Sequence, residues 1–217
     1  MLTIPTADLL GTIGDCLPFI SGDKEDVERR CVHLRWDGAM FHASSFDGIR
    51  AAVSSWDPDD IPDTDVQDEI GTALGEDTDG EWEFLLSSDD AAHLLKTAKP
   101  VKGMEYVPLF VTFDGPLLTV RRAKATRLPG FTLAYDGMGH AFPDLRGFVV
   151  EAAGKTEPVK EISFNAVLMA DFGKVRQRGN PARWTFAGDR SPAVVEIGER
   201  FVGALMPVRP AEDKAAA

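Results

Sequence analysis

The chain has little cysteine and no long apolar run. Its 217 residues include two cysteines, Cys16 and Cys31, and neither belongs to a spaced pair of the kind that holds zinc. We predict that both are small buried hydrophobic residues, without a disulfide or a metal site. No segment approaches the ~20 apolar residues that span a bilayer, and the N-terminus lacks the basic and apolar stretches of a secretory signal. These absences predict a cytoplasmic protein without a membrane partner.

The sequence also lacks the residue sets on which most enzymes depend. It shows no nucleophile with an accompanying base, no phosphate-cradling glycine loop and no paired carboxylates on ordered elements. Its histidines are scattered over predicted strands, a helix and a turn. We therefore predict that the chain is not an enzyme and takes no cofactor. The four histidines are His33, His42, His93 and His140.

Positive charge is absent from one stretch of the chain. Residues 57–80 hold ten acidic residues and no Lys or Arg, so they account for most of the formal net charge of -12. With Pro58, Pro62 and several glycines, this segment is predicted to be a solvated loop, with a short helix over 66–74 as a variant. A calcium site is not predicted, because the acidic residues do not alternate ahead of a turn glycine and a distal glutamate.

Three stretches of the sequence repeat one pattern, a short apolar helix followed by a strand, a tight turn and a strand. They cover residues 2–56, 82–135 and 162–209. Each stretch has an Asp-Gly or Gly-Asp pair at the matching place. Such pairs indicate a tight turn, because their residues tolerate the positive φ that the turn needs. The repeat predicts an internally duplicated α+β scaffold, with helices on one side of antiparallel sheets. The turns are Asp37-Gly38, Asp114-Gly115 and Gly188-Asp189.

Capping residues and helical spacing place the three helices. The first is predicted to begin at Thr6 as its N-cap. The second begins at Ser87, whose hydroxyl can accept the amide of Asp90 while that carboxylate reaches back. The third begins at Asn165 and ends at Gly179. The apolar positions predicted to face the sheet are Leu9, Leu10, Ile13 and Leu17, then Ala91, Leu94 and Leu95, then Val167, Leu168 and Phe172.

Alternating apolar residues place the strands, because successive side chains of a strand point to opposite faces. Residues 46–56 are also predicted as a strand, although Ile49, Ala52 and Val53 have helical spacing as well and a helix is the alternative. The residues predicted to face the core are Val32, Leu34 and Trp36, then Leu109, Val111 and Phe113, then Trp184, Phe186, Val195, Ile197, Phe201, Gly203 and Leu205.

Several motifs, in this order, resemble the bacterial DNA polymerase III beta sliding clamp family. They are Ala43-Ser44-Ser45-Phe46-Asp47-Gly48-Ile49-Arg50-Ala51, then Phe142-Pro143-Asp144-Leu145-Arg146, then Ile162-Ser163-Phe164-Asn165 and Met206-Pro207-Val208-Arg209. Residues 1–148 resemble one complete domain of that family, and residues 160–210 resemble half of its last domain. The resemblance implies a complete clamp-like domain at 1–148 with the acidic loop 57–80, a partial clamp-like domain at 149–210 and a flexible tail at 211–217.

The resemblance also implies a ring of paired helix-and-sheet units, with helices lining a central hole. The bacterial ring uses twelve such units, whereas this chain has three. Four chains could complete a ring, two odd halves could pair across a two-fold axis, or no ring forms. The expected state is a homo-oligomer, and the sequence does not choose among these arrangements.

In the family, three of these segments, those that contain Gly48, Pro143 and Met206, converge on an apolar pocket that captures short peptides of polymerases and clamp loaders. Methionine adapts to varied side chains, and Gly48 allows a partner backbone to approach. The resemblance implies that Arg50 and Arg209 hold a carboxylate or carbonyl at the rim. The alternative is that Met206 and Val208 are simply the last core strand and that Pro143 ends a loop. The implied peptide-binding set is Gly48, Ile49, Arg50, Pro143, Phe148, Met206, Pro207, Val208 and Arg209.

A clamp that slides on duplex DNA contacts phosphates without reading bases, so basic residues are expected on its helices. The first helix argues against this, because it carries Asp8 and Asp15 and no basic residue. The alternative is that the basic residues form ordinary solvated faces. The candidates for DNA contact are Lys96, Lys99, Lys102, Arg121, Arg122, Lys174, Arg176 and Arg178.

The resemblance therefore implies a sliding-clamp-like processivity factor that tethers a DNA polymerase or other replication proteins to duplex DNA. The alternative is a clamp-like adaptor or inhibitor that binds the same peptides without encircling DNA, which the incomplete third unit and the acidic loop favour. Both would act by holding a partner close to its template, which needs no chemistry of the chain's own.

Overall fold

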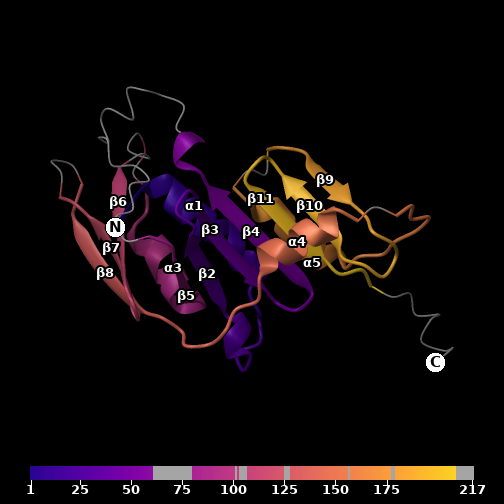
Figure 1. Cartoon of the computed structure of the whole chain (residues 1–217), viewed down its shortest axis with the longest axis horizontal. Coiled ribbons are helices and arrows are strands. Elements are labelled where there is room, and N and C mark those ends of the chain that lie inside the picture. Colours follow the sequence, from indigo (N-terminus) through magenta and orange to yellow (C-terminus); the bar gives the residue numbers. More distant parts are fainter. Residues whose placement is uncertain are drawn as a thin grey trace.

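The computed structural model describes residues 1–60, 80–100, 102, 107–124, 128–155, 157–176 and 179–208. They form two antiparallel sheets with helices packed on them (Figure 1). The α+β class and the repeated helix-and-sheet units predicted from the sequence are confirmed. The variant helix at 66–74, Arg178, Arg209 and the tail 211–217 lie outside the described residues. None of the described helices is long and apolar enough to cross a bilayer.

The first two units have the same order of elements and exchange strands with each other. Strand β1 of the first unit pairs with β6 of the second, and β5 of the second pairs with β2 of the first, both antiparallel. Each unit thus places the strand before its helix in the other unit's sheet. The first unit is β1 (Leu2–Pro5), α1 (Thr6–Cys16), β2 (Cys31–Trp36), β3 (Phe41–Phe46) and β4 (Arg50–Trp56). The second is β5 (Trp82–Ser87), α3 (Ser88–Thr97), β6 (Pro108–Asp114), β7 (Leu117–Arg122) and β8 (Phe131–Asp136).

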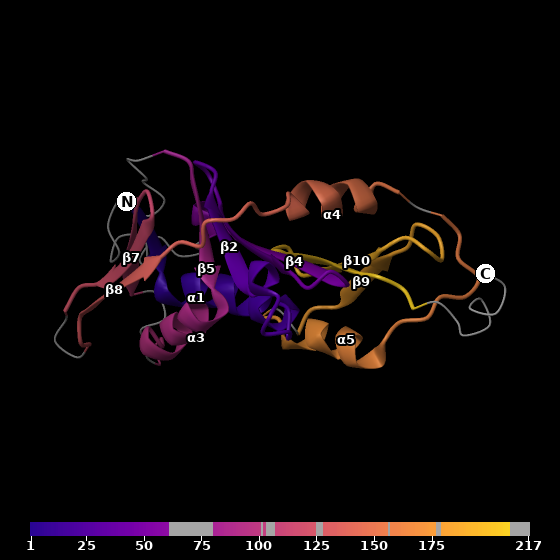
Figure 2. The same cartoon turned by 90° about the horizontal axis from the view of Figure 1, so that it is seen from below.

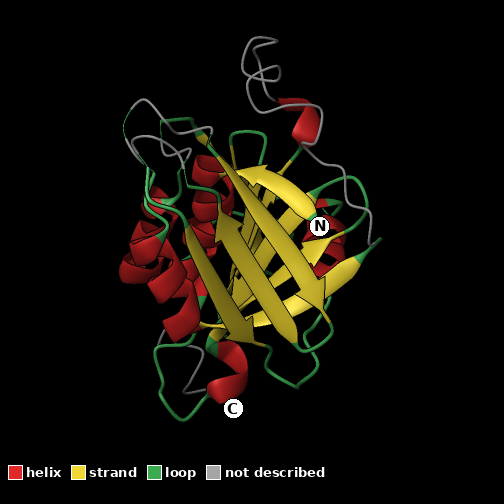
Figure 3. Ribbon diagram, turned by 90° about the vertical axis from the view of Figure 1, so that its left-hand side faces the viewer, coloured by secondary structure: helices red, strands yellow, loops and turns green. Residues whose placement is uncertain are grey.

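The third unit extends one of the two sheets. Its strand β11 pairs with β4, so one seven-stranded sheet runs in the order β5-β2-β3-β4-β11-β10-β9. The other sheet, β1-β6-β7-β8, lies at the opposite end of the molecule and is seen in Figure 3. The third unit comprises α5 (Ala166–Ala170), the 3-10 turn Asp171–Lys174, β9 (Ala182–Thr185), β10 (Ala193–Ile197) and β11 (Phe201–Leu205).

One helix was not predicted from the sequence. Helix α4 (Leu145–Ala153) begins at Asp144, whose Oδ1 accepts the amide of Gly147 at 2.9 Å. It buries Leu145 and Val149 against the sheet face opposite to α1 and α5 (Figure 2). The prediction of helices on one side only is therefore wrong. The proposed domain boundary after residue 148 falls inside this helix, and the division into domains stays a prediction.

The predicted helix starts are right in two cases of three. Ser87 Oγ accepts the amide of Asp90 at 3.1 Å and donates to its carboxylate at 2.7 Å, as the capping pattern predicted. Asn165 Oδ1 accepts the amide of Val167 at 2.9 Å. Thr6, by contrast, lies inside α1, and its hydroxyl donates to the carbonyl of Val107 at 2.6 Å. The carbonyl of Val107, directly before β6, thus accepts the hydroxyl that we expected to cap the helix.

The third helix is shorter than predicted. Its α-helical part ends at Ala170 and the 3-10 turn ends at Lys174, before the predicted end at Gly179. Val167 was predicted to be buried, but it is 75% exposed. Positions four apart share a helix face, so Leu168 packs with Phe172 on the sheet side and Val167 faces away.

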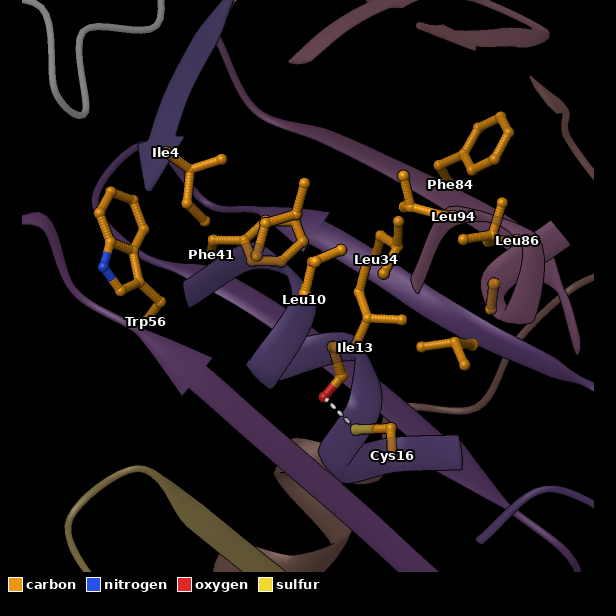
Figure 4. Close-up of a cluster of buried hydrophobic side chains, with 14 of the residues drawn as sticks. Ile4, Leu10, Ile13, Cys16, Leu34, Phe41, Trp56, Phe84, Leu86 and Leu94 are labelled. Atoms are coloured by element: carbon orange, nitrogen blue, oxygen red, sulfur yellow. Dashed lines mark hydrogen bonds between the residues drawn. The ribbon is translucent and has the colours of Figure 1, made fainter. Parts of the chain in front are cut away.

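The main core lies between the two sheets and α1 and α3. Figure 4 shows part of it, with Ile4, Leu34 and Phe41 packed around α1. Cys16 is fully buried and its Sγ donates to the carbonyl of Ala43 at 3.2 Å, and Cys31 is buried as well. A second cluster lies between α4 and the other sheet face, and it consists of Ala51, Val53, Leu145, Val149, Val194 and Ala204.

Most of the strand predictions are confirmed. Of residues 46–56, predicted as one strand, 50–56 form β4 and not a helix, whereas Phe46 ends β3 and 47–49 form the turn between them. Phe186 lies just after β9 and not within it. The three repeat turns contain Gly38, Gly115 and Gly188, with φ of 90°, 61° and 96°. Residues with a side chain adopt such angles only with strain, which explains why glycine marks these turns in the sequence.

Candidate peptide-binding pocket

Three segments that are far apart in the sequence meet around one apolar pocket on the α4 side of the seven-stranded sheet. They are the turn between β3 and β4, the first half of α4 and the end of β11. The cavity has a volume of about 210 Å³. Its lining consists of Phe46, Gly48, Ile49, Arg50, Ala51, Pro143, Asp144, Leu145, Phe148, Pro192, Ala204 and Met206.

The turn between β3 and β4 shapes the first wall. Asp47 Oδ1 accepts the amides of Ile49 and Arg50 at 2.9 and 2.7 Å, and Gly48 has a φ of 90°. This arrangement turns the chain in few residues and directs the Ile49 side chain outward. The amide of Met206 donates to the carbonyl of Ile49 at 2.9 Å, which holds the end of β11 against the same turn.

Large apolar side chains remain exposed at this pocket. Ile49 is 49% exposed, Phe148 is 45% exposed and Met206 is 38% exposed. Each comes from a different wall. Single exposed apolar residues are common on protein surfaces, whereas a cluster beside a cavity is typical of a site that contacts another molecule.

Segment 206–208 continues past the last strand, because β11 ends at Leu205. Met206 lines the pocket, whereas Pro207 and Val208 are not among the lining residues. The amide of Val208 donates to the carbonyl of Ser163 at 2.7 Å, and its side chain is 49% exposed. The alternative that Met206 and Val208 belong to the last core strand is therefore wrong.

Arg50 lines the pocket as a member of an internal ion-pair network. It is 8% exposed, and its Nε and Nη2 donate to Asp47 Oδ2 at 2.9 and 2.7 Å. Its Nη1 donates to Asp171, which also pairs with Lys174. Burial raises the pKa of Asp171, but the hydrogen bonds from Lys174 and Arg50 outweigh it and the net pKa is lowered. The implied role of Arg50, holding a partner's carboxylate or carbonyl at the rim, does not match this geometry, because two carboxylates of the chain already bind its guanidinium.

A polar cluster that the sequence did not indicate lies next to the pocket. His42 is 6% exposed, and its two ring nitrogens contact Ser55 Oγ and Asp37 Oδ2, each at 2.9 Å. The carboxylate of Asp37 can only accept, which favours a proton on Nε2, and Arg146 Nη1 also lies 3.2 Å from this nitrogen. Arg146 of α4 donates to the same carboxylate at 3.3 Å. The cluster thus ties the first turn of α4 to the β2–β3 hairpin.

The order Asp37, His42 and Ser55 is that of a hydrolase triad, but its surroundings differ. The amide of Ser55 already donates to the carbonyl of Arg200 at 2.8 Å, so it does not provide the oxyanion donor that this chemistry needs. Burial lowers the pKa of His42, Arg146 acts in the same direction, and Asp37 opposes them. We interpret the cluster as a structural tie.

The basic residues predicted to contact DNA have different environments. Lys96, Lys99 and Lys102 are exposed on α3 or directly after it. Arg121 lies on the face of β7 that points away from the helices, with its Cζ 4.6 Å from the ring centroid of Phe110. Arg122 is 6% exposed and its Nε donates to the carbonyl of Pro129 at 3.2 Å, so it is part of the interior.

Arg176 is engaged with the first helix. Its Nη1 donates to Asp8 Oδ1 at 3.1 Å and to the carbonyl of Ala7 at 3.3 Å, and its amide donates to Asp15. Burial raises the pKa values of Asp8 and Asp15, against the effect of Arg176. The acidic residues of α1 are therefore partnered within the chain. Among the described residues, no group of three or more His, Cys, Asp or Glu is placed to hold a metal ion.

No protein-family model and no curated protein matches the sequence. Solved structures do match. A DNA polymerase sliding clamp from Pseudomonas aeruginosa has a TM-score of 0.69 at 14% identity, over 96% of this chain and 66% of that chain. A sliding clamp from Bacillus subtilis has a TM-score of 0.66 at 13% identity, over 96% and 64%. The DNA polymerase III beta subunit from Thermotoga maritima has a TM-score of 0.67 at 14% identity, over 97% and 65%.

The chain thus spans slightly less than two thirds of the length of these clamps. At such low identity the likeness concerns the fold alone. The chain has the fold of a bacterial DNA polymerase sliding clamp.

Proposed function

We propose that this chain is a clamp-type tether that captures a short peptide of a replication protein in the apolar pocket. The observation that carries the proposal is the meeting of Ile49, Phe148 and Met206, from three distant segments, around one cavity of about 210 Å³. Exposed apolar side chains cost solubility, so their clustering favours a binding role over a purely structural one.

The pocket favours a peptide with one or two large apolar side chains. Its walls are mainly carbon, and Met206 can change rotamer to fit different occupants. Gly48 lacks a side chain at the β3–β4 turn, but Arg29 covers it, because a Cβ there would lie only 2.5 Å from Arg29 Nη1. A partner backbone would therefore have to displace the Arg29 side chain to approach this glycine. Arg50 stays neutralised by Asp47 and Asp171, so affinity for such a peptide should depend little on salt.

The second part of the proposal is contact with duplex DNA. Helices α1, α3 and α5 lie on the same side of the seven-stranded sheet (Figure 2). Lys96, Lys99 and Lys102 are the exposed cations that we assign to phosphate contact on this side. The solved structures with this fold are described as DNA polymerase sliding clamps, and we therefore name a DNA polymerase as the partner. The tether works by proximity and needs no catalysis.

A peptide-binding titration tests the pocket. Fluorescently labelled ten-residue peptides that tile the organism's DNA polymerase and clamp-loader subunits serve as probes. The Met206→Asp and Phe148→Asp variants should each weaken binding at least about tenfold, because a charge in an apolar site costs more than 1.4 kcal/mol. Val150→Asp, on the same helix and 64% exposed but outside the lining, is the control. If the unsubstituted chain and the three variants bind the peptides with equal affinity, the pocket is not the peptide-binding site.

Retention on DNA tests the second part. A protein that encircles DNA stays on closed circles after a salt wash and slides off short linear duplexes. Lys96→Glu together with Lys99→Glu should weaken retention, because each lost phosphate contact lowers the salt-dependent part of the affinity. Equal loss from circles and linear duplexes would instead support the adaptor that binds peptides without enclosing DNA.

A further inference from the structure

The first two units are joined by a reciprocal exchange of strands with a defined register. In the first unit, Ile4 lies two residues before α1 and pairs with Leu109 of the second unit. In the second unit, Leu86 lies two residues before α3 and pairs with Val32 of the first. Both receiving positions face the core and stand at the same distance from their turn glycines, Gly115 and Gly38. The two units are therefore related by an approximate two-fold rotation.

The third unit has the parts for this exchange but lacks a partner unit among the described residues. Strand β9 ends the seven-stranded sheet, and within the described chain it pairs only with β10. Residues 161–165, directly before α5, belong to no strand. Phe164 stands two residues before α5, as Ile4 and Leu86 do before their helices. An open strand edge of this kind readily accepts another strand.

The helix of the third unit is also uncovered. In the first two units α1 packs against α3, with Leu95 facing Gly14. Helix α5 lies on the same side of the sheet (Figure 2), yet Val167 is 75% exposed and Met169 is 38% exposed. An apolar helix face and an open strand edge thus belong to the same unit. In each of the first two units, the other unit, which has the same architecture, covers the corresponding strand edge and helix face.

We propose that a second copy of this chain covers the third unit through a two-fold strand exchange. The register follows from the turn glycines. Ala182 precedes Gly188 by the same number of residues as Val32 precedes Gly38 and Leu109 precedes Gly115, so Ala182 is the receiving position of the third unit. Phe164 of one copy lies opposite Ala182 of the other, and Ser163 lies opposite Arg183. Val167 and Met169 of the two α5 helices pack against each other.

This register suits the residues on both sides. Trp184 pairs with Val195 and shares its face with Ala182, toward the core, so an incoming Phe164 joins an apolar face. Phe164 already lies 5.9 Å from Trp184 within the chain, measured between ring centroids. The exchanged strand ends before Ala187, because Glu157 of the same chain already forms a β-bridge with Ala187. The amide of Glu157 donates to the carbonyl of Phe186 at 3.1 Å.

The two-fold relation makes the interface isologous, so both copies use the same surface and the assembly closes. The proposal does not rest on the peptide pocket, which lies on the opposite face of the seven-stranded sheet. Failure of one therefore leaves the other intact.

Sedimentation of the full chain from about 1 to 100 µM tests the association, because mass action makes a dimer visible in this range. We expect a concentration-dependent dimer or a larger assembly built from it. The double variant Val167→Lys with Met169→Lys should raise the dimer dissociation constant at least about tenfold. Its thermal unfolding as a monomer should match the unsubstituted chain, because both side chains are exposed. Val150→Lys, an exposed position on α4, is the control and should still dimerise.

Disulfide trapping tests the register. A Ser163→Cys chain is mixed with a size-tagged Arg183→Cys chain, so that a bond between these positions must join two molecules. The native Cys16 and Cys31 are buried and should not compete. We expect the mixed disulfide dimer, and none from Lys155→Cys mixed with Arg183→Cys. The proposal is overturned if the chain stays monomeric at about 100 µM. It is also overturned if a dimer forms without the Ser163–Arg183 disulfide and the substitutions at Val167 and Met169 do not change its dissociation constant.

Discussion

Arg50 and Asp171 form a buried ion pair that joins the β3–β4 turn to the 3-10 turn after α5, across 121 positions of the sequence. Asp47 holds the other side of the same guanidinium. Because the carbonyl of Ile49 in this turn also accepts the amide of Met206, the pair helps to hold two walls of the pocket together.

Loss of the Arg50 guanidinium should destabilise the fold. Arg50→Ala leaves the carboxylates of Asp47 and Asp171 largely buried with fewer partners, which costs about 3 kcal/mol of unfolding free energy. Lys174→Ala removes only the exposed partner of Asp171, and its expected cost is below about 1 kcal/mol. Urea unfolding of the two variants checks this. If both variants lose a similar amount of unfolding free energy, the buried Arg50–Asp171 pair contributes little to stability.

Stability should fall as the pH drops below about 6.5, the ordinary histidine value. Burial lowers the pKa of His42 in the folded chain, so the unfolded chain takes up the proton first. The neutral His42 ring contributes fully to the unfolding free energy above about pH 6.5. This contribution is lost as the pH falls from there toward the lowered pKa of the folded state.

Urea midpoints at neutral and mildly acidic pH compare the unsubstituted chain with His42→Gln. The stability difference between the two should shrink in acid. His33, whose pKa burial also lowers, is present in both proteins and cancels in the comparison. A difference that is constant with pH would contradict the assignment of a neutral His42.

Gly203 of β11 should tolerate no side chain. A Cβ there would lie 2.7 Å from Phe172 Cε1 and 2.9 Å from the carbonyl oxygen of Ala51 on the neighbouring strand. Gly203→Ala should therefore cost about 2 kcal/mol through displaced neighbours. Gly173→Ala, where nothing lies within 4 Å, is the matched control and should change thermal unfolding little. Equal melting temperatures of the two variants would refute the close approach.

Both thiols should react slowly in the folded chain. Burial raises the pKa of Cys31 to about 11 and that of Cys16 further, so little thiolate is present at pH 8. Alkylation by iodoacetamide, followed by mass spectrometry, should be at least about tenfold slower than in urea. Rapid modification of Cys31 without denaturant would mean that the residues covering it open frequently.

Features carried by neighbouring residues were predictable from the sequence. The cap at Ser87 and Asp90 and the turn at Gly38 each need contacts over only a few positions. Helix α4 was missed because Gly147 and the two valines at 149 and 150 weaken the local helix signal. Its burial of Leu145 against β4, β10 and β11 stabilises it, and this contact is not local.

The pocket could be expected only through a resemblance, since no spacing within the sequence shows that residues 49, 148 and 206 meet. The roles of the arginines were less predictable still. Arg122 and Arg176 look like exposed cations in a linear sequence, but in the fold one stacks on Phe131 and the other reaches Asp8. A charge that pairs at long range cannot be distinguished from a solvated one without its neighbours in space.

The sequence by itself determined the repeat, the strand faces and most helix starts, because hydrogen bonds and side-chain alternation within a few residues control them. Only the tertiary structure decided that β1 joins β6, that β11 joins β4 and that Arg50 binds Asp171. These choices depend on which apolar faces the whole chain can bury at once, and many strand pairings satisfy the local rules equally well.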